Sequence, residues 1–224
     1  MHKVLIAFAV LLSTTAALAA DGRADDIERL QNGATVIKEI MQAPDNGVPL
    51  DIISGAKCIA VMPGMLKAAF VVGGAYGKGV ASCRTLNGWS APAFFTLKGG
   101  SFGFQIGGES ADIVMLIMND HGMNNLLQSK FKLGADASVA AGPVGRHADA
   151  STDWKMRAEV LTYSRARGVF AGISLNGAVV AQHKEDTRDF YGRMVPFKTI
   201  LRGNIASPKE AAMWNEALLK YAGK

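Results

Sequence analysis

Short apolar runs separated by glycine or turn residues fill the sequence between positions 57 and 119, and they restrict the fold more than any other feature of the chain. The runs are KCIAVMPG, KAAFVVGGAYG, KGVASCR, APAFFTLKGG, FGFQIGG and ADIVMLIMND. Runs of this length and spacing are typical of a meandering antiparallel sheet. Glycine within such runs allows a sheet to curve and lets neighbouring backbones approach closely.

Further strands and a short helix are expected after this region. Strand-like runs follow at 133–141, 159–163, 169–175 and 178–181. Asn-Gly pairs at 87–88 and 176–177 predict hairpin turns. A short helix is expected at about 124–130.

The segment Asp25–Gln42 predicts an amphipathic helix. Its apolar residues recur at steps of three and four, which places them on one helix face: Ile27, Leu30, Ile37 and Met41. This face can pack on the protein core, or it can dock on a membrane with Lys38 beside it. Interfacial helices usually carry Lys and Arg flanks, whereas this helix begins with acidic residues.

A second helix is expected at the C terminus, with Ser207 as N-cap, Pro208 at its first position and Glu210 in the capping-box place. Together these patterns predict an α+β fold: a curved, mainly antiparallel sheet or partial barrel with an N-terminal amphipathic helix and flanking helices. No Pro-, Gly- or Ser-rich linker divides the chain, so we expect a single domain.

Residues 1–19 have the layout of a secretory signal peptide. Lys3 precedes an apolar run that ends in small residues, with Ala17-Leu18-Ala19 as the cleavage site. The apolar run is too short for a membrane-spanning helix, and no cysteine lies near the cleavage point to carry a lipid anchor. We therefore expect a signal peptide over 1–19 and one domain over 20–224, in the periplasm or secreted.

Composition and charge indicate a globular protein with an anionic partner. Hydrophobic residues make up 49% and charged residues 19% of the 224 residues, which excludes a disordered chain. Loss of residues 1–19 removes only Lys3 from the charge count and lowers the formal net charge from +5 to +4. Basic residues are concentrated between positions 155 and 202. Outside the cytoplasm we expect anionic lipid headgroups as the partner, and no nucleic acid; ordinary solvated surface is the alternative.

Two cysteines, Cys58 and Cys83, lie in apolar, strand-like runs. An oxidising compartment would allow them to form a disulfide. They could equally be two buried small hydrophobic residues.

Motifs for catalysis are weak. GGSFG at 99–103 matches the G-x-S-x-G nucleophile pattern, which needs a strand-to-helix turn that presents the serine. Another strand-like run follows Ser101, so a hairpin turn is the better interpretation. The histidines at 121, 147 and 183 have no recognisable triad context, and we expect no enzymatic activity.

Phosphate-loop and metal motifs are incomplete. GGAYGKGV fails the P-loop pattern, because Val72 stands where the first glycine should be and Gly79 follows Lys78 in place of Ser or Thr. Glu109 and Asp112 could serve as a carboxylate pair, but we interpret them as turn and strand-end residues. The histidines are single and widely spaced, so we expect no metal and no cofactor.

The segment SRARGVFAGISLNGAVV, residues 164–180, predicts strands separated by turns. Arg165 and Arg167 have the same parity in the strand and are expected to point to one side, at the mouth of a hairpin.

Several stretches together resemble the SYLF family, a lipid-binding domain found in bacterial exported proteins, in a eukaryotic protein with a Src-homology domain and in yeast actin-associated proteins. The matching pieces run in the family order from about residue 27 to residue 192: AKCIAVMPG, KAAFVVGGAYGKGV, NGWSAPAFFTLKGGSFGFQIGGESADIVMLIMN, ASVAAGPVGR, SRARGVFAGISLNGAVV and FYG.

The resemblance implies binding of phosphoinositides and other acidic lipids through a basic surface and the N-terminal helix. For an exported chain we expect glycerophospholipid or lipid A phosphates instead of phosphoinositides. The candidate lipid-binding residues are basic side chains at strand ends or beside glycine turns: Lys67, Lys78, Lys98, Arg146, Arg165 and Arg167. Actin binding is known for some relatives, but an exported chain has no obvious actin to meet. A scaffolding protein of the cell envelope that binds another protein is the alternative function.

Overall fold

A computed structural model describes residues 2–43, 47–68, 74–100, 111–145, 158–166 and 169–223. Within these ranges, side chains are described from residue 22 onward, except at 66–68, 74, 75, 100 and 166. The helices are α1 (His2–Gln42), α2 (Leu50–Gly55), α3 (Asp120–Leu126), α5 (Lys184–Tyr191), α6 (Phe197–Leu201), the 3₁₀ turn η2 (Lys209–Ala211) and α7 (Ala212–Ala222). The strands are β1 (Cys58–Ala68), β2 (Gly74–Thr85), β3 (Gly88–Trp89), β4 (Ala93–Gly100), β5 (Ala111–Ile117), β6 (Lys130–Lys132), β7 (Val139–Ala141), β8 (Val160–Ala166), β9 (Val169–Gly172) and β10 (Val179–Gln182).

All of these strands belong to one curled, mainly antiparallel sheet, and the predicted α+β class is confirmed. The strand order is β6-β10-β4-β2-β1-β5-β8-β7, with β3 paired to β2 and β9 paired to β8. Among the described pairs, only β7 and β8 run parallel. The register of β1 shifts between Met62 and Met65. Gly64 lies within this bulge with φ at +61°, a conformation that glycine adopts without strain.

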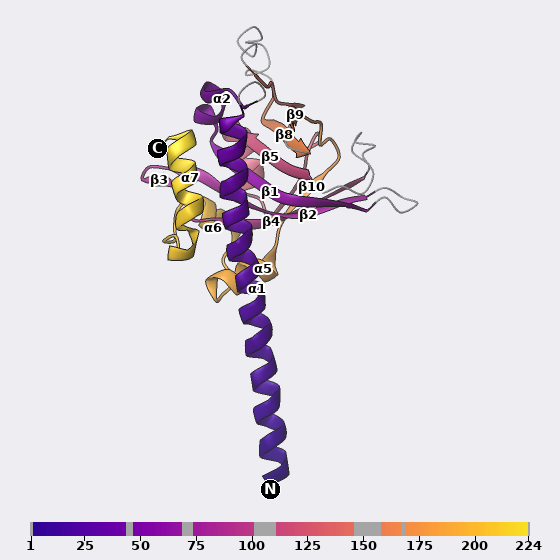
Figure 1. Ribbon diagram of the computed structural model, residues 1–224, viewed down its shortest axis with the longest axis vertical. Helices are drawn as coiled ribbons and strands as arrows, with labels where there is room; N and C mark the ends of the chain where they lie inside the picture. Colours follow the sequence, from indigo (N-terminus) through magenta and orange to yellow (C-terminus); the bar gives the residue numbers. More distant parts are fainter. Residues whose placement is uncertain are drawn as a thin grey trace.

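The sheet has an apolar core on each face. On one face, α1, α5 and α7 pack on strand residues such as Phe94 and Leu116, and Trp214 of α7 is fully buried there. Figure 1 shows α1 crossing the strands with α7 beside it, while the first turns of α1 project beyond the rest of the molecule. The opposite face buries alternate strand residues, including Phe95 and Leu97, under α6 and α3. We call the first of these the helix-bearing face.

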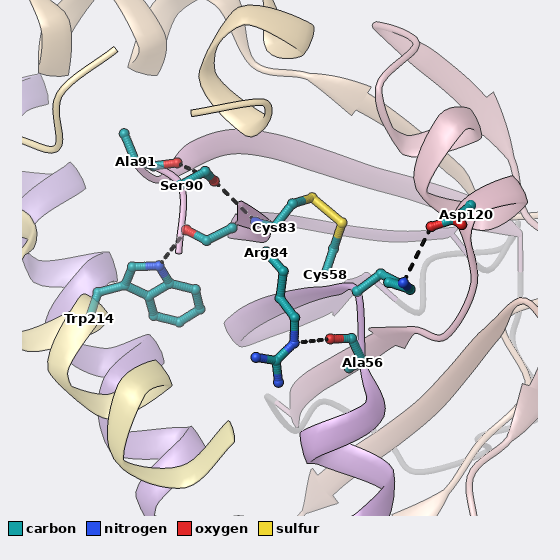
Figure 2. The surroundings of a disulfide bond; sticks show 10 residues. Ala56, Cys58, Cys83, Arg84, Ser90, Ala91, Asp120 and Trp214 are labelled. Atoms are coloured by element: carbon teal, nitrogen blue, oxygen red, sulfur yellow. Dashed lines mark hydrogen bonds and ion pairs between the residues drawn. A yellow bond between two sulfur atoms is a disulfide. The ribbon is translucent and has the colours of Figure 1, made fainter. Parts of the chain in front are cut away.

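Cys58 and Cys83, for which the sequence left a disulfide and two buried hydrophobic residues open, form a disulfide. The two residues are directly paired across β1 and β2, and their sulfur atoms are 2.04 Å apart (Figure 2). Both are fully buried in the core. The two interpretations of the cysteines are therefore compatible, because the bridge itself is part of the apolar packing.

Some predicted elements were wrong in their bounds or partners. The strand expected over 133–141 is divided, because residues 134–136 form a turn between β6 and β7. The turn at 176–177 does not close a hairpin, since β9 pairs with β8 and β10 pairs with β4 and β6. An Asn-Gly pair specifies a local reversal of the chain, whereas the pairing partner of each strand depends on distant residues.

The helix bounds also differ from expectation. The short helix expected at about 124–130 is α3, which begins earlier because Asn119 caps it by accepting a hydrogen bond from the amide of Gly122 at 2.8 Å. The C-terminal helix begins as the turn η2 and lacks the predicted side-chain cap. The hydroxyl of Ser207 instead accepts a hydrogen bond from Asn215. Helix α1 includes the predicted Asp25–Gln42 segment and continues back to His2.

Candidate functional site

Three exposed lysines lie together on the helix-bearing face of the sheet: Lys98 on β4, and Lys130 and Lys132 on β6. We call them the lysine patch. The strand β10 lies between β4 and β6, and its Val179 is paired with Lys98 on one side and with Lys132 on the other. Directly paired residues point to the same face of a sheet. Because side chains alternate along a strand, Lys130 shares this face with Lys132.

The lysine patch is solvent-exposed and has an aromatic neighbour. Tyr76 on β2 is directly paired with Lys98, and the Lys98 ammonium lies 5.3 Å from the centroid of the Tyr76 ring. The Tyr76 side chain is itself 42% exposed. Within the described part of the chain, no carboxylate forms an ion pair with any lysine of the patch. The side chains of Lys98, Lys130 and Lys132 are exposed.

Lys78 also projects from this face, but it is held by an internal carboxylate. Its ammonium lies 2.9 Å from Asp186 Oδ1, and Asp186 is almost completely buried at the start of α5. The same carboxylate contacts the guanidinium of Arg29 at 2.9 Å, and the Nδ1 atom of His183 also lies 2.9 Å from it. Lys78 thus joins β2 to α5 and α1, and this predicted lipid-binding residue already has a structural partner.

A second buried carboxylate completes this charge cluster. Asp26 on α1 is fully buried, and its Oδ1 atom accepts a hydrogen bond from Arg29 at 2.6 Å, while Oδ2 has no hydrogen-bond partner among the described residues. Burial and the nearby charge of Asp186 raise the pKa of Asp26 to about 7, against the opposing effect of Arg29. Burial also acts to raise the pKa of Asp186, but hydrogen bonds from His183 and Lys78 and the charge of Arg29 hold it below its ordinary value.

Arg165 lies on the same face of the sheet, on β8. Its Nε and Nη2 atoms lie 2.7 and 2.5 Å from Asp112 Oδ2 on the neighbouring strand, and its Nη1 atom contacts Glu39 on α1. The amide of Gly64 donates a hydrogen bond to Asp112 Oδ1 at 2.8 Å. Burial raises the pKa of Asp112, and the bond from Gly64 opposes that rise.

An open cleft of about 280 Å³ lies between α1 and these strand residues. Its lining residues are Asn32, Thr35, Val36, Pro63, Gly64, Asp112 and Arg165. Arg165 and Asp112 form part of its wall, so the arginine is accessible from the cleft although two carboxylates already contact it.

The apolar face of α1 is occupied by the sheet. Leu30 and Ile37 are fully buried, and Ile27 and Met41 pack partly buried against the same core. Lys38 is exposed on the other side of the helix. Of the two interpretations of this helix, the structure therefore fits core packing.

The remaining predicted site residues are less informative. The backbone of Lys67 lies in β1, paired with Ala75, but its side chain is outside the described atoms. Arg146 and Arg167 lie outside the described residues, as do Ser101 and Glu109. Of the six basic residues predicted to share a surface, Lys78, Lys98 and Arg165 have described side chains. All three project from the helix-bearing face, and the strands β1 and β5 separate Arg165 on β8 from Lys78 on β2.

Sequence reasoning missed Lys130, Lys132 and Tyr76. The alternation in the tripeptide KFK, with Phe131 buried between two exposed lysines, was the available signal. This signal can be used only when it is known that residues 130–132 form a strand and that β10 alone separates this strand from β4 in the sheet.

Among the described residues, no group of three or more His, Cys, Asp or Glu side chains is arranged to hold a metal ion. Nor does any described helix combine the length and the apolar character that a bilayer-spanning segment requires.

Comparison with known proteins identifies the family. The family model described as "Ysc84: Las17-binding protein actin regulator" matches residues 98–221. SH3 domain-containing YSC84-like protein 1 of Rattus norvegicus is 32% identical over 201 residues, which cover 87% of this chain and 59% of that protein. The Homo sapiens protein of the same name is 31% identical over 201 residues, with coverages of 87% and 58%.

A yeast relative extends the comparison. LAS seventeen-binding protein 3 of Saccharomyces cerevisiae is 34% identical over 168 residues, which cover 73% of this chain and 36% of the yeast protein. The chain thus spans about three fifths of the length of the vertebrate relatives and a smaller share of the yeast protein. The family model itself covers more than half of this chain, and the resemblance seen in the sequence is confirmed. The chain therefore belongs to the Ysc84, or SYLF, family.

Proposed function

We propose that this protein is a non-enzymatic binding module that attaches to anionic phospholipids or other phosphate-bearing lipids at the cell envelope. The observation that carries the proposal is the lysine patch: Lys98, Lys130 and Lys132 share one face of the sheet, are exposed, and lack ion-pair partners among the described residues. Tyr76 beside Lys98 supplies an aromatic ring with a polar end, which suits the boundary between headgroups and acyl chains.

The binding force in this proposal is electrostatic. Each lysine close to an anionic membrane surface contributes about 1 kcal/mol, so three together correspond to about a hundredfold in affinity. Exposed charges are screened over about 8 Å at physiological ionic strength, so binding should weaken as salt is added. The apolar face of α1 contributes nothing to binding here, because the sheet already covers it.

The location in this proposal is the periplasm or the cell exterior. The signal-peptide layout of residues 1–19 supports it, and so does the disulfide between Cys58 and Cys83, since such bridges persist in oxidising compartments. In α1 the first described contacts with the body involve Gly22 and Arg23. Cleavage after Ala19 would leave these described contacts in place.

The test is cosedimentation of the purified protein with vesicles of phosphatidylcholine, with and without phosphatidylglycerol, over a range of salt concentrations. Wild type should bind only the anionic vesicles, and less at high salt. The variant K98E/K130E/K132E should lose this binding. The matched control K198E/K209E/K220E makes the same change in net charge at exposed positions of α6, η2 and α7. Equal binding by both triple variants would reject the lysine patch as the lipid-binding surface.

A second candidate function is binding of another protein by the same surface. It is favoured by the family description, which names Las17 binding and actin regulation, and by the name of the yeast relative. In an exported protein the partner would be a protein of the cell envelope, and this protein would act as a scaffold. Binding to protein-free vesicles that depends on an anionic headgroup distinguishes the two candidates, because the lysine patch would bind an acidic protein with the same weakening at high salt.

A further inference from the structure

The guanidinium of Arg165 is fixed from the sheet side. Asp112 and Arg165 are directly paired on β5 and β8, and Asp112 Oδ2 receives both the Nε and the Nη2 side of the guanidinium. Asp112 is in turn held by the Gly64 amide at the bulge in β1. A guanidinium that is fixed along one edge presents its remaining N–H groups in a defined direction, which favours recognition of an oxyanion.

The contact that Glu39 of α1 makes with Arg165 differs from that of Asp112. Glu39 touches only Nη1, and its side chain is 43% exposed. Pairs between exposed carboxylates and cations usually contribute no more than about 1 kcal/mol to stability. The Glu39 contact is thus the exchangeable partner of Arg165, whereas Asp112 is the fixed one.

The cleft borders Arg165, the residue that Glu39 contacts. Asn32, Val36 and Glu39 are spaced by four and three residues, which places them on one face of α1. Asn32 and Val36 line the cleft together with Arg165, so α1 contributes an amide and an apolar side chain to the cleft that the guanidinium borders.

We propose that Glu39 is an internal substitute for an anionic ligand, and that a phosphate group takes its place on Arg165 when the ligand binds. This inference rests on the proposed function, to which it adds a second, regulated position on the helix-bearing face. Arginine binds phosphate through two parallel N–H···O bonds, and a phosphomonoester offers three acceptor oxygens. Since Asp112 already balances the charge of Arg165, a phosphate binds in exchange for Glu39 and not in addition to it. The Glu39 carboxylate therefore lowers affinity for the ligand.

The test compares Glu39→Gln with Glu28→Gln, the same change at an exposed position of the same helix about 16 Å away. Cosedimentation is measured with vesicles containing phosphatidic acid, a phosphomonoester, and with vesicles containing phosphatidylglycerol, a phosphodiester. We expect Glu39→Gln to bind phosphatidic acid vesicles at least about threefold more tightly than wild type. Glu28→Gln should match wild type. The double variant E39Q/R165K keeps the positive charge but loses the fork, and should lose the gain.

Equal behaviour of Glu39→Gln and Glu28→Gln overturns the inference but leaves the lysine patch untouched. If wild type binds no anionic vesicle, the proposed function is rejected. The exchange of Glu39 for phosphate on Arg165 is then tested by titration with inorganic phosphate. In that arm, the NMR signal of the Arg165 Nε–H group is followed in Glu39→Gln during titration with phosphate. If the Arg165 Nε–H signal shifts in Glu39→Gln but not in Glu28→Gln, the ligand that replaces Glu39 on Arg165 is a soluble anion. If the signal shifts in neither variant, the inference is overturned.

Discussion

The guanidinium of Arg84 lies over the ring of Trp89, 4.6 Å from its centroid, and both side chains donate a hydrogen bond to the carbonyl of Gly223. Arg84 also donates to Ala222 at the end of α7 and to Ala56 just after α2, and Figure 2 shows the latter bond. Carbonyls at helix C-termini lack partners within their own helix. One arginine of β2 thus joins the ends of two helices to the sheet.

Replacing Arg84 with alanine should destabilise the protein by about 2 to 4 kcal/mol, because several carbonyl groups lose a charged donor at once. Arg84→Lys should recover only part of this loss, since an ammonium cannot reproduce the planar fork or its stacking on Trp89. Chemical denaturation followed by circular dichroism measures both changes. Arg193→Ala, at an exposed loop position, is the control and should leave the free energy of unfolding within about 0.5 kcal/mol of wild type.

Gly79 accounts for part of the packing between β2 and β4. A Cβ atom added there would lie 2.4 Å from the Phe95 ring and 2.7 Å from the carbonyl oxygen of Val61. Neither neighbour can move freely, because Phe95 is fully buried and the oxygen belongs to the backbone. Gly79→Ala should therefore lower the free energy of unfolding by about 1 to 3 kcal/mol.

The control for this substitution is Gly55→Ala, at the end of α2, where the nearest atom to the added Cβ is Met118 Cε at 3.8 Å. This is an ordinary contact, and alanine favours a helix by up to about 1 kcal/mol over glycine. Gly55→Ala should be neutral or slightly stabilising. A Gly79→Ala protein as stable as Gly55→Ala would show that the strands relax without cost.

The Gly79 example shows what the sequence predicts well. Apolar runs broken by glycine indicated a curved sheet and close approach of strands, because both are consequences of local residue types. The apolar context of Cys58 and Cys83 likewise indicated that both are buried, but it left the bridge between them open.

Partners far apart in the sequence could not be predicted in this way. Arg165 and its partner Glu39 are separated by 126 positions, so no local pattern indicated that the arginine was already paired. Lys78 likewise meets Asp186 only because α5 packs against α1 and β4, next to β2 in the sheet. The lysine patch exists because β10 lies between β4 and β6. The Asn-Gly turn at 176–177 had instead predicted a hairpin between the strands on either side of it.

Reduction of the disulfide should destabilise the protein. Cys58 and Cys83 close a loop of 25 residues, for which the chain-entropy model gives about 3 kcal/mol. Urea denaturation with and without a thiol reductant should show this difference, and Cys58→Ala/Cys83→Ala should be insensitive to the reductant. Identical unfolding curves of the wild type under both conditions would indicate that the two sulfurs are not bridged in the isolated protein.

The buried carboxyl of Asp26 predicts a pH dependence of stability. Its pKa is raised from 3.8 to about 7 by burial and by Asp186, so the folded protein retains a proton between about pH 4 and pH 7 that the unfolded chain releases. Because the native state binds more protons in this window, the contribution of Asp26 makes the free energy of unfolding fall as pH rises. Asp186 has a lowered pKa and acts in the opposite sense, with stability lost only as the pH falls into the acid range.

Asp26→Asn keeps an oxygen that can accept the Arg29 hydrogen bond and removes the ionisable group. We expect the variant to equal wild type near pH 4 and to be more stable at pH 8, by on the order of 2 kcal/mol. The difference between the two proteins isolates Asp26 from the other titrating groups, which both proteins share. Asp25→Asn, at the exposed neighbouring position, should follow the wild-type profile at every pH. A difference between Asp26→Asn and wild type that stays constant from pH 4 to pH 8 would mean that Asp26 is ionised throughout, with Arg29 outweighing both its burial and the charge of Asp186.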